Sequence, residues 1–310
     1  MNPKYKVFLL FVVFCLLLSF CVAAAPPVEC AWSGVDRIVA VGDVHGDYDQ
    51  LVKVLRLAEV IDDKNVWIGG KTHLVQTGDV LDRGPDSKKA MDLLMELETQ
   101  AAAAGGFVHA LMGNHEAMVP LGMLQYVHPG EFEAFGGREG LLKALSPQGD
   151  YGKWIAGHNV AIRINDILFL HGGMSPEYAK KPLPELNDAA RQEFREGKEV
   201  KDGILMGLNG PLWCRDYAVK EEAALIPDLD AVFKAYSVSR MVVGHTVSKS
   251  GIQTRCNGRV VMIDVGLSAT YGGPAQCLLV EKGVFYVVAS KVKKELFPQT
   301  PPEAKTPKAD

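Results

Sequence analysis

Cysteine is scarce in this sequence, and basic residues do not outnumber acidic ones. Six of the 310 residues are cysteines, and no two stand in a Cys-x-x-Cys pair, so a cysteine zinc site is not expected. The 33 lysines and arginines face 37 acidic residues, for a net charge of −4, without long runs of one sign. The basic footprint of a nucleic-acid-binding protein is missing, which excludes nucleic acid as a partner.

The one long hydrophobic run lies at the N-terminus. Two lysines precede an apolar stretch from Val7 to Val22, and three alanines and two prolines follow it. A positive start, an apolar run and an exit of small residues predict a secretory signal peptide over residues 1–25. The run approaches the roughly 20 residues that span a bilayer, so an uncleaved anchor is the alternative. The bulky Phe20 disfavours Cys21 as a lipid-attachment site.

This N-terminus predicts the secretory route: the periplasm in a Gram-negative bacterium, or the secretory pathway or secretion in a eukaryote. Membrane contact is expected only if the segment stays uncleaved or is lipidated. Four cysteines follow it, Cys30, Cys214, Cys256 and Cys277. Buried thiols are the default expectation, and three disulfide pairings are open in an oxidising compartment.

The rest of the chain has the composition of a globular protein, 48% hydrophobic and 23% charged overall. Apolar runs rich in β-branched residues predict buried strands at 36–43, 72–79 and 106–114. Apolar residues at helical spacing predict helices at 47–61 and 86–104, each beginning with an aspartate. Strand and helix alternate, which predicts an α/β sheet with helices on both faces.

The pattern changes in the middle of the chain. A stretch rich in glycine and aromatic residues at about 127–159 predicts an inserted helical segment. Strands resume after it, residues 184–238 are mostly helical, and residues 240–289 are rich in strands.

The domain organisation follows from these patterns. No convincing linker divides the chain, so residues 36–290 are predicted to form one domain. Residues 291–310 are rich in lysine and proline and are predicted to form a disordered tail.

Five apolar stretches each stop at polar residues that can bind a metal. Ligands of open α/β sheets gather beyond the carboxyl ends of the strands, so we expect these residues to meet at one place. The glycines beside them allow sharp turns and close approach. The motifs are GDVHG (Asp43, His45), GDVLDRG (Asp79, Asp82, Arg83), GNHE (Asn114, His115, Glu116), HGG (His171) and GH (His245).

Each motif alone is a weak signal, because a Gly-Asp at a strand end is usually a turn. Together they supply two aspartates, one asparagine and three histidines, which is enough for two transition-metal ions with one bridging carboxylate. The remaining histidines lack such partners and are expected to be ordinary core or surface residues. They are His73, His109, His128 and His158.

In order and spacing, the five motifs resemble the phosphoprotein phosphatase family of calcineurin-like metallophosphoesterases, over roughly residues 38–271. The variants HGGMSP, GPLWCR and DVGLSATYGG are most similar to its Shewanella-like branch. The resemblance implies a four-layer α-β-β-α sandwich of two mixed sheets. It also implies a metal-dependent phosphomonoester hydrolase, most simply a protein phosphatase acting on phosphotyrosine, phosphoserine/threonine or both, with a phosphorylated protein as partner.

The resemblance also implies a set of metal ligands. They are Asp43 and His45 for the first ion, Asp79 for both ions, and Asn114, His171 and His245 for the second. Such mixed donors accept manganese, iron and zinc alike, so the identity of the two divalent ions stays open. The ions would lower the pKa of a shared water, and the bridging hydroxide would attack phosphorus directly.

Three catalytic residues follow from the same resemblance. His115 is not a ligand in this scheme but the general acid that protonates the leaving group. Asp82 would fix the imidazole ring of His115. Arg83 would bind the phosphoryl oxygens, since a guanidinium matches them two at a time.

Substrate-binding residues are proposed on the same basis, with alternatives. Arg215 is a candidate for a second phosphate clamp, or else a surface arginine paired with Asp216 or Glu221. Tyr271 is a candidate pocket residue, or else a packed tyrosine. Asn114 is expected to reach the substrate as well as a metal, and Glu116 is expected to brace its loop by hydrogen bonds.

Two other functions stay open at this point. Symmetrical dinucleoside tetraphosphatases share GDxHG, GDxxDRG and GNHE, so a nucleotide hydrolase is the first alternative. The second is a secreted binding protein with a catalytically silent metal site, although no ligand is missing here. The pocket around residues 117–165 would separate protein from nucleotide substrates.

Overall fold

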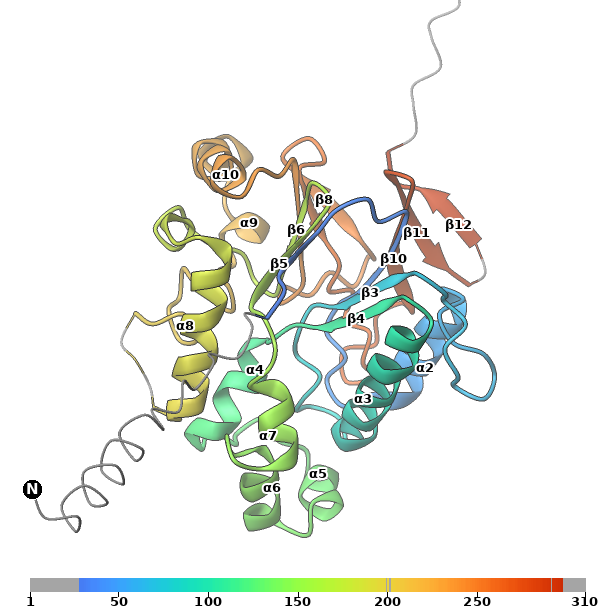
Figure 1. The fold of residues 1–310 in the computed structure, drawn as a ribbon, viewed down its shortest axis with the longest axis vertical. Helices are drawn as coiled ribbons and strands as arrows, with labels where there is room; N and C mark the ends of the chain where they lie inside the picture. Colours follow the sequence, from blue (N-terminus) through green and yellow to red (C-terminus); the bar gives the residue numbers. More distant parts are fainter. Residues whose placement is uncertain (1–27, 199, 201, 291, 298–310) are drawn as a thin grey trace, which may run out of the picture.

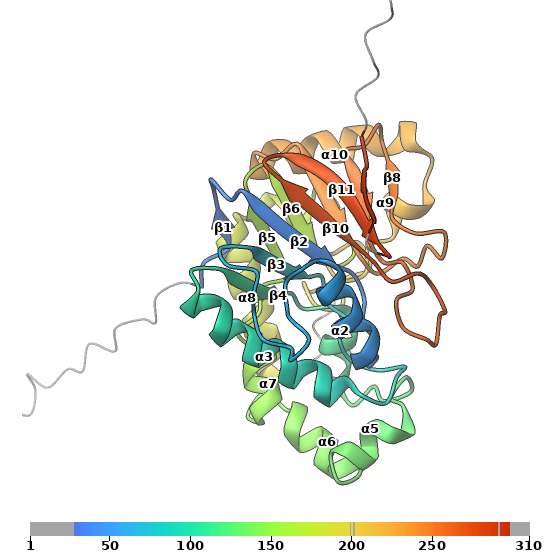
Figure 2. The ribbon, with the colours of Figure 1, turned by 90° about the vertical axis from the view of Figure 1, so that its right-hand side faces the viewer.

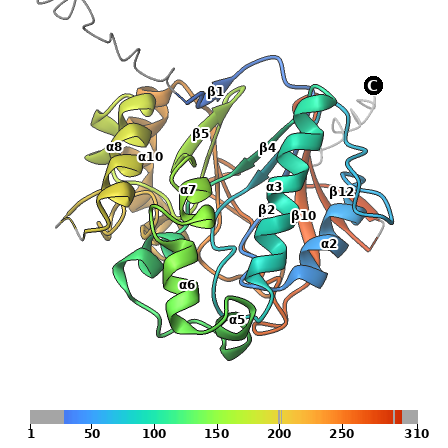
Figure 3. The ribbon, with the colours of Figure 1, turned by 60° about the horizontal axis from the view of Figure 1, so that its bottom comes forward.

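The computed structural model describes residues 28–198, 200, 202–290 and 292–297. Two six-stranded sheets lie in the middle of the molecule. Helices flank the pair of sheets, with α8 (Leu183–Glu196) and α10 (Glu222–Tyr236) on one side and α2 (Tyr48–Leu57) and α3 (Ser87–Ala103) on the other (Figure 3). This arrangement confirms the predicted sandwich of two mixed sheets.

One sheet contains the first three predicted strands. Its strands in spatial order are β12 (Val292–Glu295), β11 (Val284–Ala289), β10 (Gln276–Glu281), β2 (Arg37–Val41), β3 (His73–Gln76) and β4 (Phe107–Ala110). β2, β3 and β4 are parallel, whereas β10 runs antiparallel to β2. The carboxyl ends of β2, β3 and β4 therefore lie at the same edge of the sheet.

The other sheet carries the later motifs. Its strands in spatial order are β1 (Ala31–Trp32), β5 (Ala161–Ile164), β6 (Ile167–Leu170), β7 (Arg240–Val243), β9 (Val260–Met262) and β8 (Gln253–Arg255). β6, β7 and β9 are parallel, so the residues that follow them also gather at one edge.

Local sequence explains the elements that carry the first two motifs. The side chains of β2 from Ile38 to Val41 are almost fully buried, as the continuous apolar run of a covered parallel strand requires. In α2 the buried residues Leu51, Val54 and Leu55 recur at helical spacing. The side chain of Asp47 caps this helix by accepting the backbone N–H of Gln50 at 3.0 Å.

The predicted inserted segment is helical. It contains α5 (Pro129–Ala134), α6 (Arg138–Leu145) and α7 (Asp150–Ile155), which gather at the lower end of the molecule in Figures 1 and 2. Two short helices precede it, α4 (Asn114–Met118) and η1 (Val119–Leu121). The other short helices are η2 (Tyr178–Lys180) and α9 (Asp216–Val219).

The ends of the chain differ from the prediction. The tail expected from residue 291 is wrong for Val292–Glu295, which form β12 and pair with β11. Likewise, β1 pairs with β5 through Ala31 and Trp32, before the predicted domain start at residue 36. Backbone pairing holds both strands, whose side chains are half-buried or exposed. The predicted signal peptide, 1–25, and residues 298–310 of the predicted tail lie outside the described residues.

The cysteines after the N-terminal segment follow the default expectation. Cys30, Cys214, Cys256 and Cys277 are all buried and free of disulfide bonds. Burial raises the pKa of Cys214 to about 11, so a reactive thiolate at this position is disfavoured. Within the described ranges, no helix has the length and apolar character needed to cross a membrane.

Candidate metal centre

The polar residues at the strand ends meet, as predicted. Loops after β2, β3, β6 and β7 and the first turn of α4 bring six residues together, all of them buried. They are Asp43, His45, Asp79, Asn114, His171 and His245. Binding of metal by these six residues stays a prediction, which the geometry below supports.

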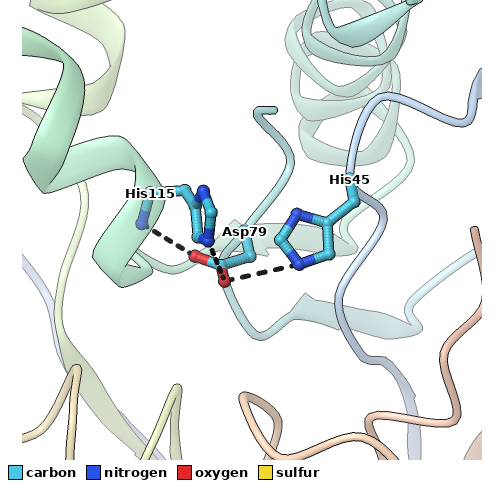
Figure 4. Close-up of side chains that lie close together, drawn as sticks. All are labelled: His45, Asp79 and His115. Atoms are coloured by element: carbon cyan, nitrogen blue, oxygen red, sulfur yellow. Dashed lines mark hydrogen bonds and ion pairs between the residues drawn. The ribbon is translucent and has the colours of Figure 1, made fainter. Parts of the chain in front are cut away.

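Asp79 lies at the centre of this cluster. Its Oδ2 is 3.3 Å from Nε2 of His171, 3.7 Å from Nε2 of His45 and 3.8 Å from Nε2 of His115. Figure 4 shows the carboxylate between the rings of His45 and His115. Burial alone would raise the pKa of Asp79, but the adjacent His171 and His115 outweigh burial and hold it well below its usual range.

Backbone carbonyls orient two of the histidines. Nδ1 of His45 is 3.0 Å from the carbonyl of Leu81, and Nδ1 of His171 is 2.9 Å from the carbonyl of Thr77. A carbonyl can only accept a hydrogen bond, so the proton of each neutral ring lies on Nδ1. Each Nε2 then presents a lone pair to the cluster, which is the form that binds a metal.

The contacts of His171 fit a bound cation. Its Nε2 lone pair faces Oδ1 of Asn114 at 2.9 Å and Oδ2 of Asp79 at 3.3 Å. In the neutral ring these three acceptor atoms repel one another, and either a proton on Nε2 or a metal ion among them removes the repulsion. Nε2 of His245 is also buried without a hydrogen-bond partner, which costs free energy unless it has a ligand.

The buried carboxylates of Asp43, Asp79 and Asp264 also favour a bound cation. Asp43 accepts the backbone N–H of His245 at 3.1 Å, and its pKa is raised well above the usual range by burial and by the neighbouring Asp264 and Asp79. Within the described ranges, no lysine or arginine pairs with any of these three aspartates. Bound cations would balance their charge.

The candidate ligand atoms form two overlapping groups. One comprises His45, Asp79 and His115, and the other comprises Asp79, His171 and His245, with the atoms of each group within 4.8 Å of one another. The predicted scheme uses Asp43, whose Oδ2 lies 3.9 Å from Nε2 of His45, in the first group and keeps His115 as the proton donor. Asp79 belongs to both, as a bridging carboxylate must. The residues present therefore fit a divalent metal centre.

His115 and Asp82 form a pair beside this cluster. Nδ1 of His115 is 2.5 Å from Oδ2 of Asp82, so the ring is held through Nδ1 and its Nε2 faces Asp79. Burial opposes protonation of His115, but Asp79 and Asp82 outweigh burial and raise its pKa above the ordinary value. A histidine so placed can hold a proton on Nε2 and donate it from there.

Glu116 braces the loop that carries both aspartates. Its carboxylate accepts the backbone N–H groups of Asp79, Val80 and Leu81 at 2.8, 2.9 and 3.2 Å, and that of Gly113 at 2.8 Å. The loop needs this support, because Asp79, Asp82 and Arg83 have φ values of 59°, 69° and 68°, a region that non-glycine residues rarely adopt.

Close packing explains a glycine of the GNHE motif. A Cβ at Gly113 would collide with Oδ1 of Asp79, so only glycine lets α4 begin against the central carboxylate. Because α4 begins there, the backbone N–H of His115 can donate to Asp79 at 3.0 Å.

The two candidate phosphate-binding arginines lie at the centre without carboxylate partners in the part of the chain that the structure describes. Arg215 donates from Nη1 to the carbonyl of His245 at 2.6 Å. Asp216 pairs with Lys220 instead, at 2.7 Å. Tyr271 packs its ring 5.4 Å from that of His45, so it also borders the centre.

The family model for calcineurin-like phosphoesterases matches residues 36–249. The chain belongs to this family. Its membership confirms the fold and the class predicted from the motifs, so this calcineurin-like phosphoesterase is a hydrolase of phosphoesters. The buried histidine and aspartate cluster indicates divalent metal ions as its cofactors.

Relatives of this phosphoesterase include members of the predicted branch. Shewanella-like protein phosphatase 2 of Arabidopsis thaliana is 30% identical over 324 residues, covering 87% of this chain and 82% of the relative. An uncharacterized protein of Schizosaccharomyces pombe is 35% identical over 257 residues, covering 79% and 77%. The crystal structure of a cold-active protein-tyrosine phosphatase from a psychrophilic Shewanella species has a TM-score of 0.76 at 30% identity, covering 88% of this chain and 85% of that chain.

Two residues of the centre were not predicted. Asp264 is buried beside Asp43, and its Oδ2 has no hydrogen-bond partner. Its signal was present, because Asp264 follows the apolar strand β9 in the same way as Asp43 follows β2. Tyr126 contacts both Arg83 and His115, and no periodic pattern marks it.

Proposed function

We propose that this calcineurin-like phosphoesterase is a metal-dependent protein phosphatase that hydrolyses phosphomonoesters in one step. The observation that carries the proposal is the His115–Asp82 pair, 2.5 Å apart, beside a buried cluster that fits two cations sharing Asp79. A proton donor next to a metal centre is what hydrolysis of a phosphate ester requires.

The proposed cofactor is a pair of divalent ions, manganese, iron or zinc. Asp43 and His45 would hold the first, and the second would lie on Asn114, His171 and His245, with Asp79 shared, as their mutual distances allow. When bound, such ions lower the pKa of water toward neutrality and so supply the nucleophile.

The protein's own residues then bind, orient and protonate the substrate. The guanidinium groups of Arg83 and Arg215 bind the phosphoryl oxygens, and the side-chain amide of Asn114 would add a further hydrogen bond to them. Water oxygen bonds to phosphorus as the bond from phosphorus to the ester oxygen breaks. His115 gives its Nε2 proton to the departing ester oxygen, while Asp82 stabilises the charged imidazole.

Protein substrates are favoured by the names of two relatives, a protein phosphatase and a protein-tyrosine phosphatase.

We further propose that the protein enters the secretory route, because its N-terminal segment has the pattern of a signal peptide. The intact mass of the protein recovered from its host tests whether the N-terminal segment is cleaved. A chain lacking about 25 residues is expected, and a full-length chain would favour the anchor instead.

The test of function uses the purified protein with added manganese. Turnover is compared on a phosphotyrosine peptide, a phosphothreonine peptide and diadenosine tetraphosphate, with Asp79→Asn as the control. Peptide hydrolysis that is lost in the control supports the proposal, and the ratio of the two peptides gives the specificity. Activity on the dinucleotide alone would make the protein a nucleotide hydrolase. If metal is bound but none of the three substrates is hydrolysed, the proposal is refuted in favour of a binding protein with a catalytically silent metal site.

A further inference from the structure

Tyr126 connects the segment after η1 with the catalytic residues. The centre of its ring lies 4.1 Å from Cζ of Arg83 and 5.3 Å from the ring centre of His115. Its backbone carbonyl accepts the N–H of Arg83 at 2.9 Å. One residue therefore holds Arg83 through both backbone and side chain, and it borders the proton donor.

Arg83 needs such support more than most arginines. Its φ of 68° lies in the left-handed region, and Nε of its buried guanidinium stem has no hydrogen-bond partner. The described chain gives this guanidinium no carboxylate partner. The backbone of Arg83 has one further partner besides Tyr126 among the described residues: the hydroxyl of Thr270 donates to the carbonyl of Arg83 at 3.3 Å. The contact of the guanidinium with the tyrosine ring, 4.1 Å from Cζ to the ring centre, therefore restrains the side chain itself.

Stacking on a ring restrains a guanidinium differently from a salt bridge. A carboxylate would occupy the N–H groups and neutralise the charge, whereas an aromatic face contacts the flat side of the group. The N–H donors in the plane of the guanidinium then stay available for phosphate oxygens. Support by Tyr126 thus suits an arginine whose task is to bind an anion.

We propose that Tyr126 is a positioning residue that keeps the guanidinium of Arg83 directed at the phosphate. This inference rests on the proposed function, because it takes Arg83 as a phosphate-binding residue. Tyr126 itself acts through Arg83. Through Tyr126, the irregular segment between η1 and α5 would contribute to the affinity of the site for phosphomonoesters and for inorganic phosphate.

The test is a double-mutant cycle on phosphate binding. The dissociation constant of inorganic phosphate for the manganese-loaded protein is measured by calorimetry, and KM and kcat are measured on p-nitrophenyl phosphate. The variants are Tyr126→Ala, Tyr126→Phe, Arg83→Ala and the double variant Tyr126→Ala/Arg83→Ala. Tyr151→Ala is the matched control, since Tyr151 lies on α7 and stacks with Lys88 instead of Arg83.

We expect Tyr126→Ala to weaken phosphate binding about five- to tenfold and to raise KM more than it lowers kcat. Tyr126→Phe keeps the ring and should stay within about twofold of the wild type. In the Arg83→Ala background, Tyr126→Ala should add no further loss, because residues that act through one contact are not additive. Tyr151→Ala should leave phosphate binding unchanged.

Several outcomes would overturn the proposal. Unchanged binding in Tyr126→Ala, an equal loss in Tyr126→Phe, or a full additional loss in the Arg83→Ala background each contradicts positioning through the ring. If Tyr126→Ala does not fold, Tyr126→Leu replaces it, with the same expected loss. Phosphate binding without turnover in the wild type would refute the proposed function but leave the cycle readable. No phosphate binding in the wild type would overturn both.

Discussion

Two groups of buried histidines lie in this protein and differ in what they face. The metal-edge histidines are His45, His115, His171 and His245, and the sheet-edge histidines are His73, His109 and His158. The first group faces carboxylates at 2.5–3.9 Å, or, for His245, lies in the same ligand group as Asp79. The second group packs among aromatic rings near β1, β4 and β5. Trp32 lies 4.3 Å from His109 and Trp154 lies 4.3 Å from His158, between ring centres.

The comparison of the two groups shows how burial alone changes the pKa of a histidine. Burial lowers the pKa of His73 to about 4 and those of His109 and His158 to about 3. No carboxylate opposes that effect, so these rings stay neutral and serve as packing groups. His115 is as buried as His109, yet its pKa is raised because Asp79 and Asp82 face it. Facing carboxylates is not enough by itself, since burial still lowers the pKa of His45 to about 4 although Asp43 and Asp79 face it. His115 differs in its direct hydrogen bond to Asp82.

The largest expected effect comes from removing the proton donor. His115→Asn should lower kcat by about 10²–10⁴. The loss should be smaller on an activated aryl phosphate than on an alkyl phosphate, because a good leaving group needs less protonation. Steady-state kinetics on the two substrates measure both effects. His109→Gln is the matched control and should keep kcat within about twofold. Equal losses in both variants would erase the distinction between the two groups.

Metal removal should affect stability through the proposed ligands, such as His245, and not through the sheet-edge histidines. At a hundredfold excess over Kd, a bound ion adds about 2.7 kcal/mol, which is roughly 4–5 °C in Tm for a chain of this size. Thermal unfolding with manganese and with chelator measures the difference. His109→Gln should retain the difference and His245→Ala should lose most of it. A difference that survives in His245→Ala would place the ion elsewhere.

Asp82 should matter through His115. Asp82→Asn removes the charge that fixes and stabilises the imidazolium, and kcat should fall by about 10–100-fold. The same substitution lowers the pKa of His115, so the basic limb of the pH–rate profile should move to lower pH. Profiles measured from pH 5 to pH 9 test this. An unchanged basic limb would show that Asp82 does not act on the proton donor.

The smallest expected effect lies at the sheet edge. The folded protein holds His158 neutral down to about pH 3, whereas the ordinary pKa is 6.5. As pH falls through this window the unfolded chain binds a proton that the folded chain does not, so stability falls. His158→Phe keeps a packed ring and should reduce the loss of unfolding free energy between pH 7 and pH 5.5 by about 1 kcal/mol. Urea unfolding at several pH values measures it. An unchanged slope would mean that His158 is protonated in the fold.

The sequence predicted the central elements and the six candidate ligands because both signals are local. Buried runs such as β2 and β3 are continuous, and polar residues at their ends are expected to meet. The edge strands β1, β8 and β12 have two to four residues with mostly half-buried or exposed side chains, so their backbone pairing leaves no pattern. Asp264 follows β9 as Asp43 follows β2, so its position could have been predicted. Tyr126 depends on packing between distant segments, which spacing cannot reveal.

Anomalous diffraction from a crystal grown with manganese tests the central claim most directly. The account predicts two manganese peaks about 3.5–4 Å apart, both beside the carboxylate of Asp79, and no peak among the sheet-edge histidines. A manganese peak among His73, His109 and His158, or none beside Asp79, would contradict it.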